Sequence, residues 1–209
     1  MTTYAFSDAA VEYARYWYQN ERRFVDGLAS GDRNLRLDAL CRAARYFIVS
    51  RNFPKRFDVG RGLARLSPAL AELDSVPARP LDAGELSATV RSFARSLGAA
   101  YGGRNLLSAA SKFLWLVRRD VVVIYDSRVR AALGTPFGDY DRYLESWFDA
   151  YRRKLDSVHA ACSALSVLSL HLQPHDRPSD RELSHLSTQD WFRRRVHDIW
   201  LWHLGEPRK

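Results

Sequence analysis

The chain has 209 residues, of which 46% are hydrophobic and 12% aromatic, enough to bury the core of one compact domain or of two closely joined lobes. Its 32 lysines and arginines outnumber 24 aspartates and glutamates, and the net charge of +8 favours a polyanionic partner, most often a nucleic acid. A basic protein-interaction module that binds no nucleic acid is an alternative that charge alone leaves open.

Cysteine usage and the apolar stretches exclude several classes of protein. Cys41 and Cys162 lie far apart in apolar helical stretches, and neither has the spacing of a metal or iron–sulfur site. We therefore expect no metal and no cofactor. The first residues lack the order of a signal peptide, and the longest apolar stretch, 160–172, is too short to span a bilayer. We expect a cytoplasmic protein without a membrane partner.

Apolar residues recur every three to four positions along most of the chain, which is the period of α-helices. The first lobe, about residues 1–80, would contain three helices, with cap residues or proline at their starts. They are expected from Ser7 to Gly27, from Asp32 to Val49, and from Ser67-Pro68 onward.

The second lobe, about residues 81–209, continues the same pattern. A helix is expected from Asp82 to about Leu97, followed by glycine-rich residues 98–104 and by an apolar helix over residues 105–117. The β-branched residues 121–125 allow at most one short extended segment. The fold class predicted for the chain is therefore all-α.

Helix signals also mark the last third of the chain. A short helix would end at Gly134, and a long helical region would begin at Asp139, with a break near Ser157. Thr188 is expected to cap a final aromatic helix, residues 191–203. His197 and His203 lie six positions apart on it and do not share a helix face, which argues against a metal site there.

Lys112 stands alone in the apolar run 105–117 and is one of only four lysines in the chain. At helical spacing it shares a narrow strip with Ser108 and Trp115. An apolar setting favours the uncharged amine, the form that acts as a nucleophile. The alternative is a lysine that extends into solvent or pairs with an acid, as most lysines do.

Asp126 follows the β-branched segment and lies 14 residues after Lys112. An aspartate directly before a helical run is a good N-cap, because its side chain accepts from the first backbone N–H groups. Capping is compatible with catalysis, since the cap fixes the carboxylate in place. The residues alone therefore suggest a paired amine and carboxylate, or two unrelated structural residues.

The order Ser111-Lys112, then Val123-Ile124-Tyr125-Asp126, then Ser127-Arg128-Val129 resembles the catalytic segment of helix-hairpin-helix DNA glycosylases. The resemblance is greatest to the 8-oxoguanine glycosylase branch and to bacterial OGG-like proteins, and it covers about residues 100–134. The family hairpin usually reads Leu-Pro-Gly-Val-Gly, whereas this chain has Tyr101-Gly102-Gly103-Arg104-Asn105, without a proline. The interval from lysine to aspartate is also shorter than in the familiar eukaryotic enzymes.

This resemblance implies a helical HhH-GPD domain and a DNA glycosylase with AP-lyase activity that removes an oxidised or modified purine, in DNA repair or in antiphage defence. Lys112 matches the lysine that forms a Schiff base with the sugar, and Asp126 matches the aspartate that stabilises the developing positive charge. The target base would be flipped out of the duplex. Residues expected to contact DNA are Gly102, Gly103, Arg104, Trp115, Arg118, Arg128 and Arg130.

Each of these contacts has a structural alternative. Trp115 could belong to the core, and any of the arginines could be part of a solvated face. The alternative function is a non-enzymatic helical nucleic-acid-binding protein that retains only the fold.

Overall fold

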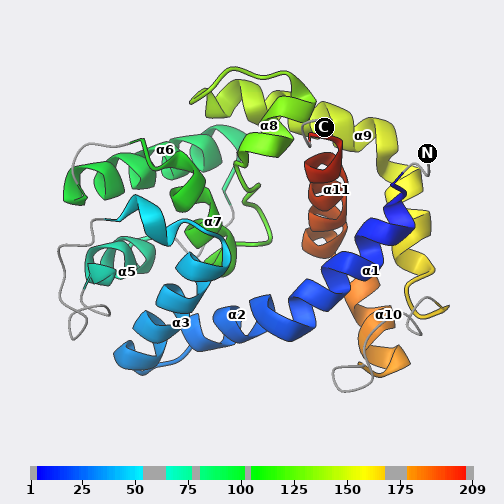
Figure 1. Cartoon of the computed structure of the whole chain (residues 1–209), viewed down its shortest axis with the longest axis horizontal. Helices are drawn as coiled ribbons and strands as arrows, with labels where there is room; N and C mark the ends of the chain where they lie inside the picture. Colours follow the sequence, from blue (N-terminus) through cyan, green and yellow to red (C-terminus); the bar gives the residue numbers. More distant parts are fainter. Residues whose placement is uncertain (1–3, 54–64, 77–80, 102–104, 168–177, 206–209) are drawn as a thin grey trace. The chain divides into compact units, whose positions relative to one another are not determined.

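The computed structural model describes residues 4–53, 65–76, 81–101, 105–167 and 178–205. Their regular structure is helical, and no β-strand occurs in these ranges (Figure 1). The all-α prediction is therefore confirmed. The chain divides into two compact units: unit 1 comprises Met1–Asn20 and Asp126–Lys209, and unit 2 comprises Glu21–Tyr125. The boundary expected near residue 80 falls within unit 2.

Unit 2 is built around an apolar helix, α7 (Leu107–Val117), whose residues are almost all buried. Four other helices of the unit pack against it, as the apolar residues on most of its circumference require. These are α2 (Arg22–Leu28), α3 (Arg33–Tyr46), α5 (Ser67–Asp74) and α6 (Ala83–Ala100), and a short 3₁₀ turn, η2 (Ser50–Asn52), follows α3.

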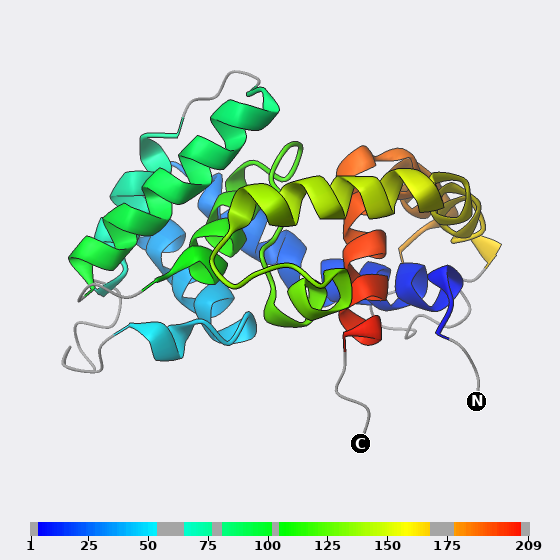
Figure 2. The same cartoon turned by 90° about the horizontal axis from the view of Figure 1, so that it is seen from above.

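Unit 1 is organised around the C-terminal helix α11 (Asp190–Leu204). It packs against α1 (Phe6–Tyr16), α8 (Ser127–Leu133), α9 (Tyr140–Ser163) and α10 (Asp180–Thr188). Figures 1 and 2 show α9 running across α11. The core between these helices is aromatic: the rings of Tyr13 and Phe192 are 5.2 Å apart, and those of Trp147 and His197 are 4.9 Å apart.

The helix starts were predicted well wherever an aspartate provides the cap. Asp32, Asp82, Asp126 and Asp139 each accept a hydrogen bond from a backbone N–H in the first turn of the following helix. Gly134 ends α8 in the left-handed conformation, with φ of 65°, as expected for a glycine after a helix.

Three expectations about the helices were wrong. The helix expected from Ser7 to Gly27 contains a π-helical turn, η1 (Trp17–Glu21), between α1 and α2. α9 is not broken near Ser157, because Val158 and Cys162 continue its buried face. Thr188 does not cap the last helix: it ends α10, its hydroxyl donates to the His185 carbonyl at 2.8 Å, and Gln189 precedes α11 instead.

None of the helices in the part of the chain that the structure describes has the length and apolar character needed to cross a membrane.

Candidate active-site residues

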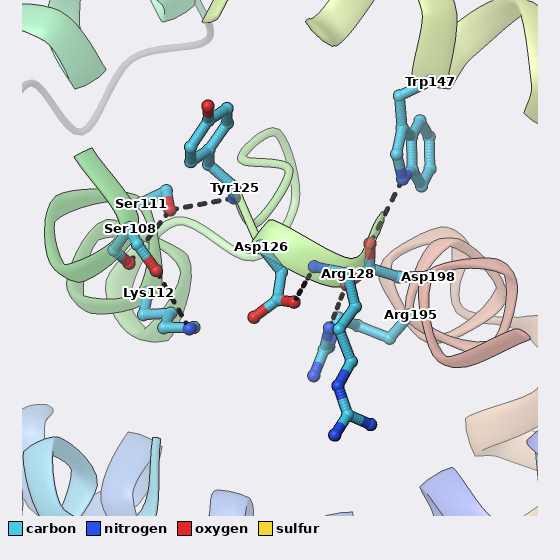
Figure 3. A network of polar contacts seen from close by, with 9 residues as sticks. All are labelled: Ser108, Ser111, Lys112, Tyr125, Asp126, Arg128, Trp147, Arg195 and Asp198. Atoms are coloured by element: carbon cyan, nitrogen blue, oxygen red, sulfur yellow. Dashed lines mark hydrogen bonds and ion pairs between the residues drawn. The ribbon is translucent and has the colours of Figure 1, made fainter. Parts of the chain in front are cut away.

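Lys112 lies on α7 in the interior of unit 2 and is only 8% exposed. Its Nζ donates a hydrogen bond of 3.0 Å to the hydroxyl of Ser108, one helical turn earlier (Figure 3). This burial excludes the alternative in which the side chain extends into solvent. The strip shared by Lys112 and Ser108, expected from helical spacing, is thereby confirmed.

Ser111 connects α7 by a hydrogen bond to the non-helical segment 122–125 that follows it. Its buried hydroxyl accepts a hydrogen bond from the Tyr125 backbone N–H at 2.9 Å and donates to the Ser108 carbonyl at 3.2 Å (Figure 3). Residues 122–125 are buried without forming a strand, so this hydrogen bond satisfies a backbone group that has no sheet ladder to join. No role was expected for Ser111, although a hydroxyl within the apolar run 105–117 was a signal.

Asp126 is the first residue of the second segment of unit 1 and is the N-cap of α8. Its Oδ1 accepts from the backbone N–H of Arg128 at 2.9 Å (Figure 3), which confirms the capping prediction. The backbone of α8 is in turn held close to the end of α11: a Cβ added to Gly205 would lie 2.0 Å from the Arg128 carbonyl oxygen. The position of Asp126 in unit 1 therefore depends on a glycine almost 80 residues later in the chain.

A buried polar network adjoins Asp126 and was missed by the sequence analysis. Asp198 on α11 accepts a hydrogen bond from Trp147 Nε1 at 3.2 Å and forms an ion pair with Arg195 (Figure 3). Burial raises the pKa of the Asp198 carboxyl to about 6; the Arg195 charge opposes this increase, and the Asp126 charge adds to it.

Tyr143 on α9 connects the same network to the backbone of Asp126. Burial raises the pKa of the Tyr143 hydroxyl well above its usual value, as do the charges of Asp198 and Asp126, and a hydrogen bond with the Asp126 backbone opposes the change. The Asp126 backbone is therefore hydrogen-bonded to Tyr143 of α9, and the Asp126 charge raises the pKa of Asp198 on α11. The sequence signal for Asp198 was its position three residues after Arg195, the spacing of an ion pair on a helix rich in aromatic residues.

His197 is fully buried among aromatic rings of unit 1, including Trp147 and Tyr151. Neither ring nitrogen has a hydrogen-bond partner among the residues described. Burial lowers the pKa of His197 to about 3, so the ring is neutral near pH 7. Within the same ranges no group of three or more histidine, cysteine, aspartate or glutamate side chains could hold a metal ion.

The residues expected to contact DNA occupy different environments. Gly102, Gly103 and Arg104 lie outside the described residues. Trp115 is 1% exposed and packs inside unit 2, as the structural alternative had it, and Arg118 in the same unit forms an ion pair with Asp120 at 3.3 Å.

The other two candidates belong to α8 in unit 1. The Arg128 guanidinium lies 3.9 Å from the centre of the Trp202 ring, and Arg130 donates to the Thr135 carbonyl at 2.7 Å. Both arginines are half-buried, so each is partly accessible from solvent.

No protein-family model matches the chain, and no curated protein and no solved structure matches it either. Function is therefore inferred from the side chains of the two units.

Proposed function

We propose that the protein is a DNA glycosylase with AP-lyase activity, in which Lys112 is the nucleophile and Asp126 assists it. The observation that carries the proposal is the buried amine of Lys112, positioned on α7 by the Ser108 hydroxyl at 3.0 Å. Lysines are rarely buried to this extent without a functional or electrostatic reason. The proposal includes an HhH-GPD-like arrangement of the helices.

The surroundings of Lys112 are suited to an amine that must attack an electrophilic carbon. Attack requires the lone pair of the neutral form. The hydrogen bond to the Ser108 hydroxyl orients Nζ on this face of α7. The apolar neighbours on α7 limit the access of water, which would otherwise compete for the reacting carbon.

The chain also supports a link between the amine and the carboxylate. Ser111 precedes Lys112 directly, and its hydroxyl holds the backbone of Tyr125, the residue directly before Asp126. This hydrogen bond joins the neighbour of Lys112 to the neighbour of Asp126, although the two are 14 positions apart along the chain. We infer that this attachment is the reason why a buried, non-helical segment connects the two.

In the proposed reaction the Nζ lone pair forms a bond to C1′ of the deoxyribose, and the bond between C1′ and the base nitrogen breaks. The base leaves with that electron pair and takes up a proton. Asp126 balances the positive charge that develops on the sugar and accepts a proton from the amine. The nitrogen lone pair then forms the imine as the C1′–O4′ bond breaks, and O4′ leaves with that bonding pair and takes up a proton. In the lyase step a proton leaves C2′ and the 3′ phosphate departs with its bonding electrons.

The substrate would be an oxidised or modified purine in DNA, flipped out of the helix so that C1′ can be reached. The net charge of +8 supports a polyanionic ligand. Cys41 and Cys162 are both buried and are not joined in a disulfide, which fits a reducing compartment such as the cytoplasm.

Borohydride trapping tests the proposal. Duplexes that contain an abasic site or 8-oxoguanine are incubated with wild type, with Lys112→Ala and with Lys154→Ala, which removes an exposed lysine of α9 as a matched control. We expect a covalent protein–DNA band for wild type and for Lys154→Ala, and none for Lys112→Ala. A band that persists in Lys112→Ala would assign the Schiff base to another amine.

DNA binding, measured at several salt concentrations, separates the enzyme from a binding protein. Lys112→Ala is expected to retain most of the affinity and the salt dependence of wild type. Salt-dependent binding by a wild-type protein that forms no covalent band on either duplex would overturn the lyase mechanism and favour a non-enzymatic nucleic-acid-binding protein.

A further inference from the structure

The turn that follows α3 in unit 2 carries an isoleucine in a strained backbone conformation. The Ile48 N–H donates to the Arg45 carbonyl at 3.0 Å, and the Val49 N–H donates to the Ala44 carbonyl at 2.9 Å. Helices that end with this pair of hydrogen bonds usually have a glycine at the position of Ile48, because its φ is positive. Ile48 has φ of 56°, which no other non-glycine residue in the described part of the chain shares in sign. A β-branched residue is rare in this conformation.

The Ile48 side chain gains little packing to compensate this strain, because it is 64% exposed. Leu35 is 56% exposed as well, but it lies in the regular first turn of α3, where exposure involves no backbone strain. Uncompensated strain is typical of residues that are held in place for binding or catalysis. The strain and the exposure of Ile48 together indicate that its side chain is presented to a ligand.

Buried residues directly after Ile48 hold the turn to the core of unit 2. Val49 is 2% exposed and Phe53 is 1% exposed, so the backbone returns at once to the interior. The Phe53 ring is stacked on that of Phe113 in α7, with their centres 5.9 Å apart. Phe113 follows Lys112 directly, so the turn is anchored on the helix that carries the proposed nucleophile. The Ile48 side chain is thereby preorganised, which lowers the entropy lost when a ligand binds.

Two arginines flank Ile48, three residues before it and three residues after it. Arg45 and Arg51 are both exposed, and residues 39–53 contain no aspartate or glutamate. Positive charge around an exposed apolar side chain favours a polyanion that also offers an apolar gap. Duplex DNA provides such a gap where a base is missing or has been rotated out of the stack. Isoleucine is one of the apolar side chains that insert between base steps.

We propose that Ile48 is a wedge that enters the base stack of duplex DNA where a base has left it, while Arg45 and Arg51 contact neighbouring phosphates. The proposal rests on the proposed function, since the wedge fills the gap that opens when the target base is flipped out. Where a base is already missing, insertion buries the isoleucine without the cost of unstacking a base pair; in an intact duplex that cost opposes insertion. Ile48 therefore gives a preference for gapped DNA, whereas the arginines act on every duplex alike.

Binding to two duplexes of the same sequence, one intact and one with a tetrahydrofuran abasic site, tests the wedge. Tetrahydrofuran forms no Schiff base, so the measurement does not depend on the chemistry of Lys112. Wild type is expected to prefer the abasic duplex, and Ile48→Gly to bind it about five- to tenfold more weakly, with little change for the intact duplex. Because glycine relieves the strain at this φ, weaker binding cannot be ascribed to unfolding.

Two further variants separate the contributions to binding. Leu35→Ala, at the other exposed apolar position, is the matched control and should bind both duplexes as wild type does. The double variant Arg45→Gln/Arg51→Gln should bind both duplexes more weakly and reduce the slope of the salt dependence by about two, while the preference for the abasic duplex remains.

Several results would overturn the wedge. Ile48→Gly with the preference of wild type would do so, as would a wild type without any preference. A wild type that binds neither duplex but self-associates through Ile48, measured by sedimentation velocity, would favour a contact between two copies of the chain instead.

The proposed function can fail separately from the wedge. A preference that depends on Ile48, without a covalent band in borohydride trapping, would support the wedge and overturn the lyase mechanism. Trapping that depends on Lys112, with a preference that survives in Ile48→Gly, would support the lyase mechanism and overturn the wedge.

Discussion

The Ser111 hydroxyl accepts a hydrogen bond from the Tyr125 backbone N–H at 2.9 Å and thereby holds a non-helical segment against α7, one residue from Lys112. This hydrogen bond gives one backbone N–H of the β-branched segment an acceptor outside any sheet. The buried Ser111 hydroxyl thus fixes the backbone of the segment that connects Lys112, the proposed nucleophile, to Asp126.

Ser111→Ala is expected to destabilise unit 2 by about 1–3 kcal/mol, because it leaves a buried N–H without its acceptor. Urea unfolding measures the effect. Ser92→Ala, at an exposed position of α6 in the same unit, serves as the control and should have little effect. Equal stabilities of Ser111→Ala and wild type would mean that the Tyr125 N–H finds another acceptor.

Lys112→Met is expected to abolish covalent trapping without lowering the melting temperature. Methionine fills a similar volume and removes a polar amine from an apolar helix, a change that often stabilises a protein at the expense of its function. Circular dichroism melting and the trapping assay together check this. A strongly lowered melting temperature would point to a structural role for the amine.

His197→Phe is expected to remove an acid-dependent loss of stability. The folded-state pKa of His197 is about 3 and its ordinary value is 6.5, so only the unfolded chain takes up the proton between these values. The stability of wild type therefore declines as the pH falls below about 6.5, by about 1.4 kcal/mol per unit from this histidine. Asp198 acts in the opposite direction: its raised pKa of about 6 adds stability as the pH falls from 6 toward 3.8.

Unfolding by urea at pH 7, 6 and 5 measures this difference. As the pH falls, the free energy of unfolding of His197→Phe should rise relative to that of wild type. The free energy of unfolding of His185→Ala, at an exposed position of α10, should change in parallel with wild type. A constant difference between His197→Phe and wild type across this range would contradict the prediction.

Ile48→Gly is expected to stabilise unit 2 by about 1 kcal/mol. Ile48 follows α3 with φ of 56°, a conformation that a β-branched residue rarely adopts, and its side chain is 64% exposed, so little packing is lost. Ile48→Ala retains a Cβ and should show little of this gain. Chemical denaturation of the two variants distinguishes relief of backbone strain from loss of the side chain.

Gly205→Ala is expected to destabilise unit 1 by about 1–3 kcal/mol, because its Cβ would overlap the Arg128 carbonyl oxygen. The shift of α8 should also displace the Asp126 cap and reduce trapping. Gly31→Ala, where a Cβ has open space, is the control. Unchanged stability and trapping in Gly205→Ala would show that α8 and α11 can separate without effect.

The sequence was sufficient where structure depends on neighbouring residues. Asp82 and Asp126 were recognised as helix caps, and Asp139 as the start of a helix, because a cap is satisfied within its own first turn. Lys112 was recognised because an isolated charge in an apolar helix is visible in the sequence itself.

The remaining features depend on contacts between distant helices. Trp147 and Asp198 are 51 positions apart, and their hydrogen bond exists only because α9 packs on α11. α10 was not expected because its start, capped by Ser179, follows a polar sequence without an apolar run. The π-helical turn at Trp17–Glu21 has no sequence signature comparable to a cap.

The division of the chain has a consequence for the order of its folding. Unit 2 is continuous in sequence, whereas unit 1 combines α1 with helices that come after Tyr125. On the ribosome, all of unit 2 therefore emerges while α1 still lacks α11, its largest partner. Lys112 can reach its buried position early, but Asp126 acquires the charges around it only when α11 has been synthesised. A truncation within α11 would leave Lys112 buried in a complete unit 2, whereas Asp126 would lack the helix against which α8 packs.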